Sequence, residues 1–148
     1  LDGLDRTRLA MPYARTGSAS FRPLGHREHA NYPDGALRSS VLDLSRFLLM
    51  SMQLGEYDGT RILSTTTVEE MFRPQVPALE DIQGYAWYHD ELGGRDVIGH
   101  DGWDPGATSF MFFDPSDGAG VLLVANGEWR DGAAERLLAK LFAESSWY

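Results

Sequence analysis

Apolar residues recur at helical spacing in the segment that follows Ser40. One side of that segment comprises Val41, Leu44, Leu48 and Met52. Residues three or four positions apart share one face of an α-helix, so the spacing predicts an amphipathic helix. Ser40 and Asp43 support this prediction, because a hydroxyl and a carboxylate in these positions stabilise a helix N-terminus. We expect Gly55 to end the helix in a left-handed conformation.

Two further regions complete the first half of the chain. A short helix is predicted over the segment STTTVEEMF, which begins at the capping residue Ser64 and ends before Pro74. Residues 1–39 are rich in Gly, Pro, Arg and Ser and show little periodicity, so we interpret them as mostly loop. A loop of that length is unusual in an independent domain and suggests a segment that wraps around a neighbouring structure.

The second half is typical of a sheet followed by a helix. The runs GYAWYHDEL and RDVIGH flank Gly93-Gly94, which is a hairpin signal, and GATSFMFFD and GAGVLLVAN follow further turn signals. Because residues 121–125 are continuously apolar, we expect that strand to be buried on both faces. A last helix is predicted after Asp131, with an apolar stripe of Ala134, Leu137, Leu138, Leu141 and Phe142.

This order of elements predicts an α+β fold in a single domain over residues 1–148. A loop and helical segment would occupy residues 1–83, antiparallel strands residues 84–126, and a terminal helix that packs on the sheet residues 131–145. The length of 148 residues is consistent with one domain.

Composition excludes several classes of function. No run approaches the roughly 18 apolar residues that a transmembrane helix needs. A net charge of −9 disfavours binding to nucleic acid. The chain has no cysteine, and His26 and His29, although three positions apart, lack helical periodicity and a third ligand. The sequence therefore predicts neither a metal site nor a cofactor.

Several segments resemble, in order, the beta-lactamase-like serine hydrolases. The segments are LDGLDRTRLAMPY, YPDGALRSSVLDLSRFLLM, RILSTTTVEEMF, GYAWY and GHDGWDPGATSFMFFDPSDGAGVLLVAN. They are similar to the middle and C-terminal segments of a family that includes class C beta-lactamases, D-alanyl-D-alanine carboxypeptidases, D-aminopeptidases and esterases. The resemblance implies the C-terminal half of the beta-lactamase/transpeptidase-like fold.

Two motifs of that family are missing from these residues. The family uses Ser-x-x-Lys for its nucleophile and base and Tyr-x-Asn or Tyr-x-Ser for proton transfer, and the chain contains neither. In the family both motifs precede the matching segments. We therefore expect the C-terminal portion of a longer hydrolase, inactive alone, whose partner is the missing N-terminal half or a second copy of the chain. An isolated fragment would expose a large apolar surface and self-associate.

One catalytic motif of the family has a counterpart here. His100, Asp101 and Gly102, followed by Trp103, resemble its Lys/His-x-Gly strand. The resemblance implies that His100 acts as donor or electrostatic partner and that Gly102, without a Cβ atom, lets the substrate approach. It places the backbone N–H of Trp103 in the oxyanion hole, where such donors lower the barrier. Tyr32 is expected in a loop that borders the cleft.

Asp101 departs from the family pattern, in which this position is often small. In the members that recognise beta-lactams it helps to bind a carboxylate, which an aspartate would repel. We therefore expect a neutral ester, or a peptide with a free amine, as the small-molecule or peptide substrate.

Two interpretations stay open at this point. The first is a serine hydrolase that cleaves an ester, amide or D-amino-acid peptide through an acyl-enzyme. The second is a non-catalytic ligand-binding or regulatory domain on the same scaffold. A lone histidine between Gly99 and Asp101 is also compatible with a turn residue that bonds a carboxylate. Upstream Ser-x-x-Lys and Tyr-x-Asn motifs would favour the enzyme.

Overall fold

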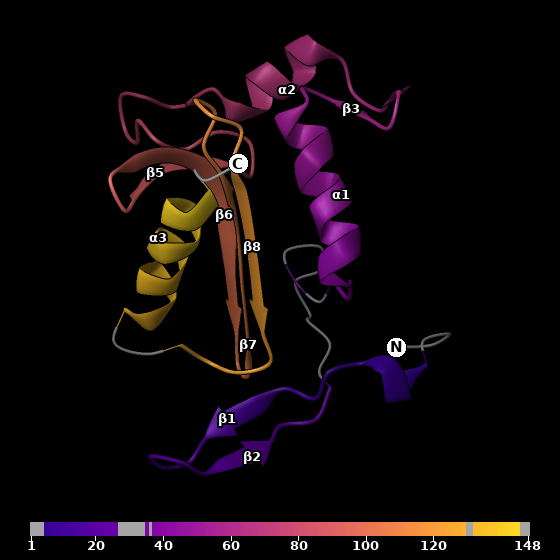
Figure 1. The fold of residues 1–148 in the computed structure, drawn as a ribbon, viewed down its shortest axis with the longest axis vertical. Coiled ribbons are helices and arrows are strands. Elements are labelled where there is room, and N and C mark those ends of the chain that lie inside the picture. Colours follow the sequence, from indigo (N-terminus) through magenta and orange to yellow (C-terminus); the bar gives the residue numbers. More distant parts are fainter. Residues whose placement is uncertain (1–4, 27–34, 36, 130–131, 146–148) are drawn as a thin grey trace.

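A four-stranded antiparallel sheet organises the structure (Figure 1). The computed structural model describes residues 5–26, 35, 37–129 and 132–145. The sheet consists, in spatial order, of β5 (Tyr88–Leu92), β6 (Arg95–Asp104), β7 (Ala107–Phe113) and β8 (Gly120–Ala125). Two-residue turns at Gly93-Gly94 and Pro105-Gly106 join the first three strands. The predicted antiparallel meander is confirmed.

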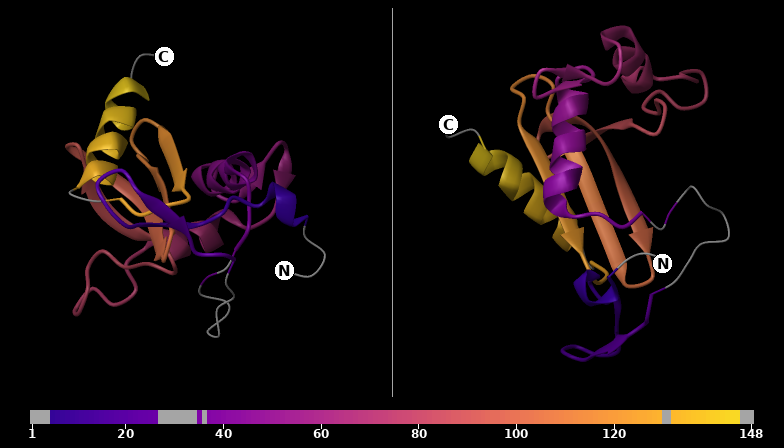
Figure 2. Two further views of the ribbon diagram at one scale, coloured as in Figure 1. Left: turned by 90° about the horizontal axis from the view of Figure 1, so that it is seen from below. Right: turned by 90° about the vertical axis from the view of Figure 1, so that its right-hand side faces the viewer.

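Each face of the sheet is covered by its own helix. α3 (Ala133–Ser145) lies against one face and α1 (Val41–Met52) against the other (Figures 1 and 2). Val97 and Phe112 belong to the cluster under α3, whereas their neighbours Ile98 and Phe113 belong to the cluster under α1. Successive side chains of a strand point to opposite faces, so β6 and β7 are apolar on both sides where the helices cover them.

The terminal helix packs on the sheet as predicted, through a narrower stripe. Ala134, Leu138 and Phe142 are buried, whereas Leu141 remains 38% exposed. The three buried positions are four residues apart and therefore follow one side of the helix. Asp131, the predicted N-cap, lies outside the described residues.

Helix α1 begins as predicted and ends differently. The Ser40 hydroxyl accepts a hydrogen bond from the Asp43 N–H at 3.1 Å and donates one to the Asp43 carboxylate at 2.7 Å. At the other end, Leu54 is the first left-handed residue, with a φ of 52°, and Gly55 follows with a φ of 95°. The Gly55 N–H donates to the Met50 carbonyl at 2.8 Å, which closes the helix end.

The segment after α1 adds a small hairpin and a second helix. The hairpin consists of β3 (Glu56–Tyr57) and β4 (Thr60–Arg61), and α2 (Thr65–Phe72) follows it. Ser64 caps α2, as predicted, because its hydroxyl accepts a hydrogen bond from the Thr67 N–H at 3.1 Å. The Phe72 ring lies 5.3 Å from that of Trp87, which joins α2 to the cluster under α1.

The N-terminal segment contains more structure than the sequence predicted. Within residues 1–39, interpreted as mostly loop, the structure has a 3₁₀-helix (Arg6–Arg8) and the ribbon of β1 (Tyr13–Arg15) and β2 (Phe21–Pro23). The ribbon lies at one end of the sheet (Figure 1), where the Tyr13 N–H donates to the Asn126 carbonyl at 3.2 Å. Strands of three mostly exposed residues have too little alternation to be recognised from sequence.

The expectation that residues 121–125 are buried on both faces is wrong for part of the strand. Val121 is buried, but Val124 is 46% exposed. β8 is the last strand of the described sheet, and its far end projects beyond the two hydrophobic clusters. Among the described residues, no helix is long and apolar enough to cross a membrane.

A buried ion pair joins Arg95, at the start of β6, to Asp114, which follows β7. The Arg95 guanidinium donates to the Asp114 carboxylate at 2.9 Å and also pairs with Asp117. Asp114 is 4% exposed and accepts from both the backbone N–H and the hydroxyl of Ser116. These hydrogen bonds, that of Ser116 first and that of Arg95 after it, hold the pKa of Asp114 below its usual value against the opposing effect of burial.

Candidate functional site: the open edge of strand β6

Strand β6 is paired on both sides only at Ile98 and Gly99, where its two partners overlap. Its first part pairs with β5, from Arg95 opposite Leu92 to Gly99 opposite Tyr88. Its pairing with β7 begins at Ile98 and continues to Asp104. From His100 to Asp104 the strand therefore has a partner on one side only among the described residues. This open segment contains all four motif residues that the sequence indicated.

The register of the two hairpins shows which backbone groups face the open side. In antiparallel pairs, residues alternate between positions that bond their partner and positions that face away from it. Counted from the two-residue turn at Gly93-Gly94, the odd-numbered residues of β6 face β5. Counted from Pro105-Gly106, the even-numbered residues face β7. Both counts direct the N–H groups of Asp101 and Trp103 toward the open side.

Side chains of the open segment divide between the two faces of the sheet. Ile98 packs in the cluster under α1, so His100 and Gly102, two and four residues on, project from that same face. His100 is exposed. Asp101 and Trp103 project from the α3 side, and the Trp103 side chain is 66% exposed. The motif thus offers an imidazole on one face and a carboxylate with an indole on the other.

The two glycines of β6 differ in the space around them. A Cβ atom on Gly99 would come within 2.2 Å of the Phe112 ring and 2.3 Å of the Met111 carbonyl oxygen. A Cβ atom on Gly102 would meet only the hydroxyl of Ser109, at 2.9 Å. Gly99 is therefore required by the packing of the sheet itself. At Gly102 the rotatable Ser109 hydroxyl alone would have to shift, so packing demands a glycine less strongly there.

Tyr88 lies beside the motif, and sequence reasoning did not single it out. Its hydroxyl donates a hydrogen bond to the Asp101 carboxylate at 3.0 Å, and its ring lies 5.9 Å from the His100 imidazole. Burial, followed by the hydrogen bond and negative charge of Asp101, raises the pKa of Tyr88 well above its ordinary value. The residue opens β5 opposite Gly99, so a correct hairpin register would have placed it beside the motif.

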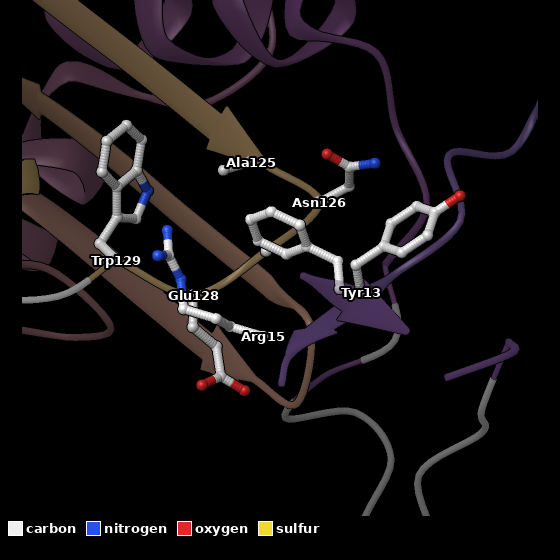
Figure 3. A pocket seen from close by; sticks show the side chains of 8 residues that line it. Tyr13, Arg15, Ala125, Asn126, Glu128 and Trp129 are labelled. Carbon is white, nitrogen blue, oxygen red and sulfur yellow. The ribbon is translucent and has the colours of Figure 1, made fainter. Parts of the chain in front are cut away.

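A pocket lies further across the same end of the sheet (Figure 3). Its volume is about 440 Å³, and it is lined by Tyr13, Arg15, Phe21, Ala125, Asn126, Gly127, Glu128 and Trp129. Ala125 is opposite Thr108 on β7, and Thr108 is opposite Trp103 on β6. The pocket is therefore about two strand spacings, roughly 10 Å, from the open edge.

The remaining sequence candidates contribute less to this geometry. Tyr32 and His29 lie outside the described residues. Within the described part of the chain, no group of three acidic or histidine side chains is placed to hold a metal ion. His89, on β5, contacts the Phe72 carbonyl oxygen through Nε2 at 2.8 Å.

Comparison with known proteins defines the family. The Beta-lactamase family model matches residues 2–144. Among solved structures, the octameric penicillin-binding protein homologue from Pyrococcus abyssi is similar, with 27% identity and a TM-score of 0.65. The similarity covers 90% of this chain and 31% of that protein, so the chain spans less than a third of its relative's length. No curated protein matches. With its sheet, its covering helices and a family match over nearly its whole length, the chain belongs to the beta-lactamase family.

Proposed function

We propose that the chain supplies the substrate-binding edge and part of the oxyanion hole of a serine hydrolase. The enzyme would act through an acyl-enzyme on an ester, an amide or a D-amino-acid peptide. The observation that carries this proposal is the open segment of β6 from His100 to Asp104, with two backbone N–H groups directed outward. An unpaired edge can bind an extended substrate by strand addition.

We assign a task to each of three motif residues in the open segment. The Trp103 N–H would donate to the oxyanion that forms when the scissile carbonyl becomes tetrahedral, and such a donor contributes about 3–4 kcal/mol to catalysis. Gly102 would keep the approach to that N–H clear. His100 lies on the same face of the sheet as α1, and its side chain is exposed. It would act as hydrogen-bond donor or electrostatic partner toward the substrate.

The nucleophile and its base have to come from polypeptide outside these 148 residues. The chain has no Ser-x-x-Lys motif, and Leu137 stands three positions before its single lysine, Lys140. That lysine lies on α3, with an exposed ammonium 3.9 Å from the Glu144 carboxylate. The chain alone would therefore bind substrate without cleaving it.

The charge of Asp101 favours particular substrates. Its carboxylate sits on the open edge, where Tyr88 holds one of its oxygens. A substrate carboxylate placed along this edge would be repelled, whereas an ammonium group would be attracted. Tyr88, which is opposite Gly99 on β5, and Trp103, which is two residues after Asp101 on β6, add aromatic rings near this carboxylate. Aromatic rings attract cations through their faces. We therefore propose a neutral ester or a peptide with a free amine as substrate.

The test uses the complete polypeptide that carries this chain. The native protein is treated with a fluorophosphonate probe and its intact mass is measured, and turnover is then compared for a neutral nitrophenyl ester, a D-alanine anilide with a free amine, and penicillin. We expect an adduct and turnover of the first two substrates. In Asp101→Asn, penicillin turnover relative to the ester should rise about three- to tenfold, because one like charge is removed.

Two results would oppose the proposal. No adduct and no turnover of any substrate, in protein that retains its fold, would favour the alternative of a non-catalytic ligand-binding domain. Efficient penicillin turnover without ester or anilide hydrolysis would overturn the assignment of Asp101. The Asp96→Asn variant, which changes an aspartate of β6 away from the open segment, is the matched control for charge.

The assembly of the relative supports one further part of the proposal. The penicillin-binding protein homologue from Pyrococcus abyssi is octameric. We propose that this chain also associates, with a second copy or with the N-terminal portion of its own protein.

A further inference from the structure

The pocket at the end of β8 has the chemistry of a ligand site that is separate from the open edge of β6. We propose that it binds a small carboxylic acid with an aromatic or branched apolar body. Its eight lining residues come from the β1–β2 ribbon and from residues 125–129, and none of them belongs to β6. The inference therefore does not depend on the proposed hydrolase reaction.

The first observation is an unpaired donor. The indole Nε1 of Trp129 is buried from solvent and has no hydrogen-bond partner among the described residues. Buried donors are almost always paired in folded proteins, so an orphaned one needs an explanation. In Figure 3 this nitrogen points across the pocket toward Arg15. A turn of the Trp129 or Arg15 side chain would bring this nitrogen within reach of an acceptor atom of a ligand, which would satisfy it.

The second observation is a cation beside that donor. The Arg15 guanidinium donates one hydrogen bond to the Ser18 carbonyl at 2.9 Å, and its centre lies 5.1 Å from the Phe21 ring centroid. A guanidinium has five N–H donors, so further donors remain for a ligand. Figure 3 shows its end directed to the side of the pocket where Trp129 lies. Two neighbouring donors, one of them charged, match the two oxygens of a carboxylate.

The third observation concerns the one acidic side chain in the pocket lining. Glu128 carries a negative charge that would oppose an anion if it faced the ligand. Figure 3 shows its carboxylate turned away from Trp129 and from the end of the Arg15 side chain. The charged group nearest to the Trp129 nitrogen in this view is therefore the Arg15 guanidinium and not a carboxylate.

The walls define the rest of the ligand. Phe21, Ala125 and the Trp129 ring provide mostly apolar surface around the two donors. An apolar group against these walls adds the hydrophobic contribution that a bare carboxylate such as acetate lacks. A cavity of about 440 Å³ is in the range of small-molecule sites and accommodates a ligand such as phenylacetate.

The walls are held in place by hydrogen bonds that leave the two donors free. The Tyr13 N–H donates to the Asn126 carbonyl at 3.2 Å, and the Asn126 side chain donates to the Met11 carbonyl at 3.0 Å. On the sheet side, the Thr108 hydroxyl donates to the Gly127 carbonyl at 2.8 Å. The backbone of the pocket walls is therefore fixed before a ligand arrives, which lowers the entropic cost of binding.

The test measures binding directly, in the complete polypeptide that carries this chain. Protein labelled with ¹⁵N is titrated with phenylacetate, and the indole N–H resonance of Trp129, identified by its loss in Trp129→Phe, is followed. We expect this resonance to move downfield with saturation at millimolar ligand. Arg15→Gln should weaken binding at least about tenfold, because a charge-assisted hydrogen bond is lost.

Matched controls make the result decisive. Arg22→Gln removes the same charge from β2 at a residue that does not line the pocket, and it should leave the affinity within about twofold. Phenylacetamide, which has the same body without the charge, should bind far more weakly. The inference is overturned if phenylacetate, benzoate and hexanoate all leave the Trp129 resonance unmoved. It is equally overturned if the amide binds as well as the acid, or if Arg15→Gln and Arg22→Gln have equal effects.

Discussion

The Tyr88 hydroxyl donates a hydrogen bond to the Asp101 carboxylate at 3.0 Å, at the point where β5 begins and beyond which β6 is unpaired on that side. The phenol therefore lies beside the boundary between Gly99, the last residue of β6 paired with β5, and the unpaired segment that follows. Its ring also packs against Phe112 in the cluster under α3, so the position of Asp101 is coupled to the core. The hydrogen bond from Tyr88 therefore restricts the rotation of the Asp101 carboxylate at the open edge.

Ionisation of Tyr88 should destabilise the fold at alkaline pH. The pKa of Tyr88 is raised in the folded state, so its contribution to stability is complete below about pH 10, where the unfolded phenol ionises. Above that pH the unfolded chain releases the proton first, and the contribution declines until the folded pKa is reached. Urea unfolding at pH 9 and pH 11 should show a smaller alkaline loss in Tyr88→Phe than in the native chain. Equal losses would refute the coupling.

Replacing the two glycines of β6 should separate packing from function. Gly99→Ala places a methyl group against Phe112 and a backbone oxygen, so the free energy of unfolding should fall by about 1–3 kcal/mol. Gly102→Ala meets only the rotatable Ser109 hydroxyl, so it should change by less than about 1 kcal/mol. Thermal unfolding of both variants measures the difference. In the longer hydrolase that we propose, Gly102→Ala should nevertheless reduce kcat/KM, and an unchanged kcat/KM would remove Gly102 from the proposed site.

The parts of the fold that sequence predicted are those with strong local signals. Ser40 and Ser64 cap their helices because a hydroxyl before a helix competes for its free N–H groups, whatever the tertiary context. The hairpin at Gly93-Gly94 is equally local, since both glycines adopt positive φ angles of 64° and 81°. In each case neighbouring residues alone determine the conformation.

The parts that sequence missed depend on distant contacts. The β1–β2 ribbon is held at the sheet by the bond between Tyr13 and Asn126, which are far apart in the sequence. The hydrogen bond between Tyr88 and Asp101 depends on where β5 begins, and no local pattern marks that residue. The exposure of Val124 likewise depends on which elements flank β8. Family resemblance placed the motif on a strand, but only the pairing of β6 shows that the strand is open there.

Removing the Asp114 carboxylate should destabilise the end of the sheet at which β6 begins. Asp114→Asn loses charge-assisted bonds to Arg95 and Ser116 in a buried position, which should cost about 1–3 kcal/mol. Because the folded pKa of Asp114 is lowered, its contribution is present above about pH 4 and is lost as the pH falls through the folded value. Chemical unfolding at pH 7 and pH 3 measures both effects. The difference between native chain and variant should shrink at pH 3, and a constant difference would contradict the electrostatic origin.

A charge on the outer side of α1 should reduce self-association. The helix buries Leu48 and Met50 but leaves Leu42 73% exposed, and Leu49, two turns further along the same side, is 39% exposed. Apolar side chains gathered on one helix favour burial against another surface, and Leu42→Glu would place a charge in that contact. Light scattering after size exclusion should show a smaller mass for Leu42→Glu than for the native chain at equal concentration. Leu79→Glu is the control, because Leu79 is 88% exposed in the segment between α2 and β5, away from α1. If both variants lower the mass equally, net charge alone is responsible, and if neither does, this face of α1 is not where the copies meet.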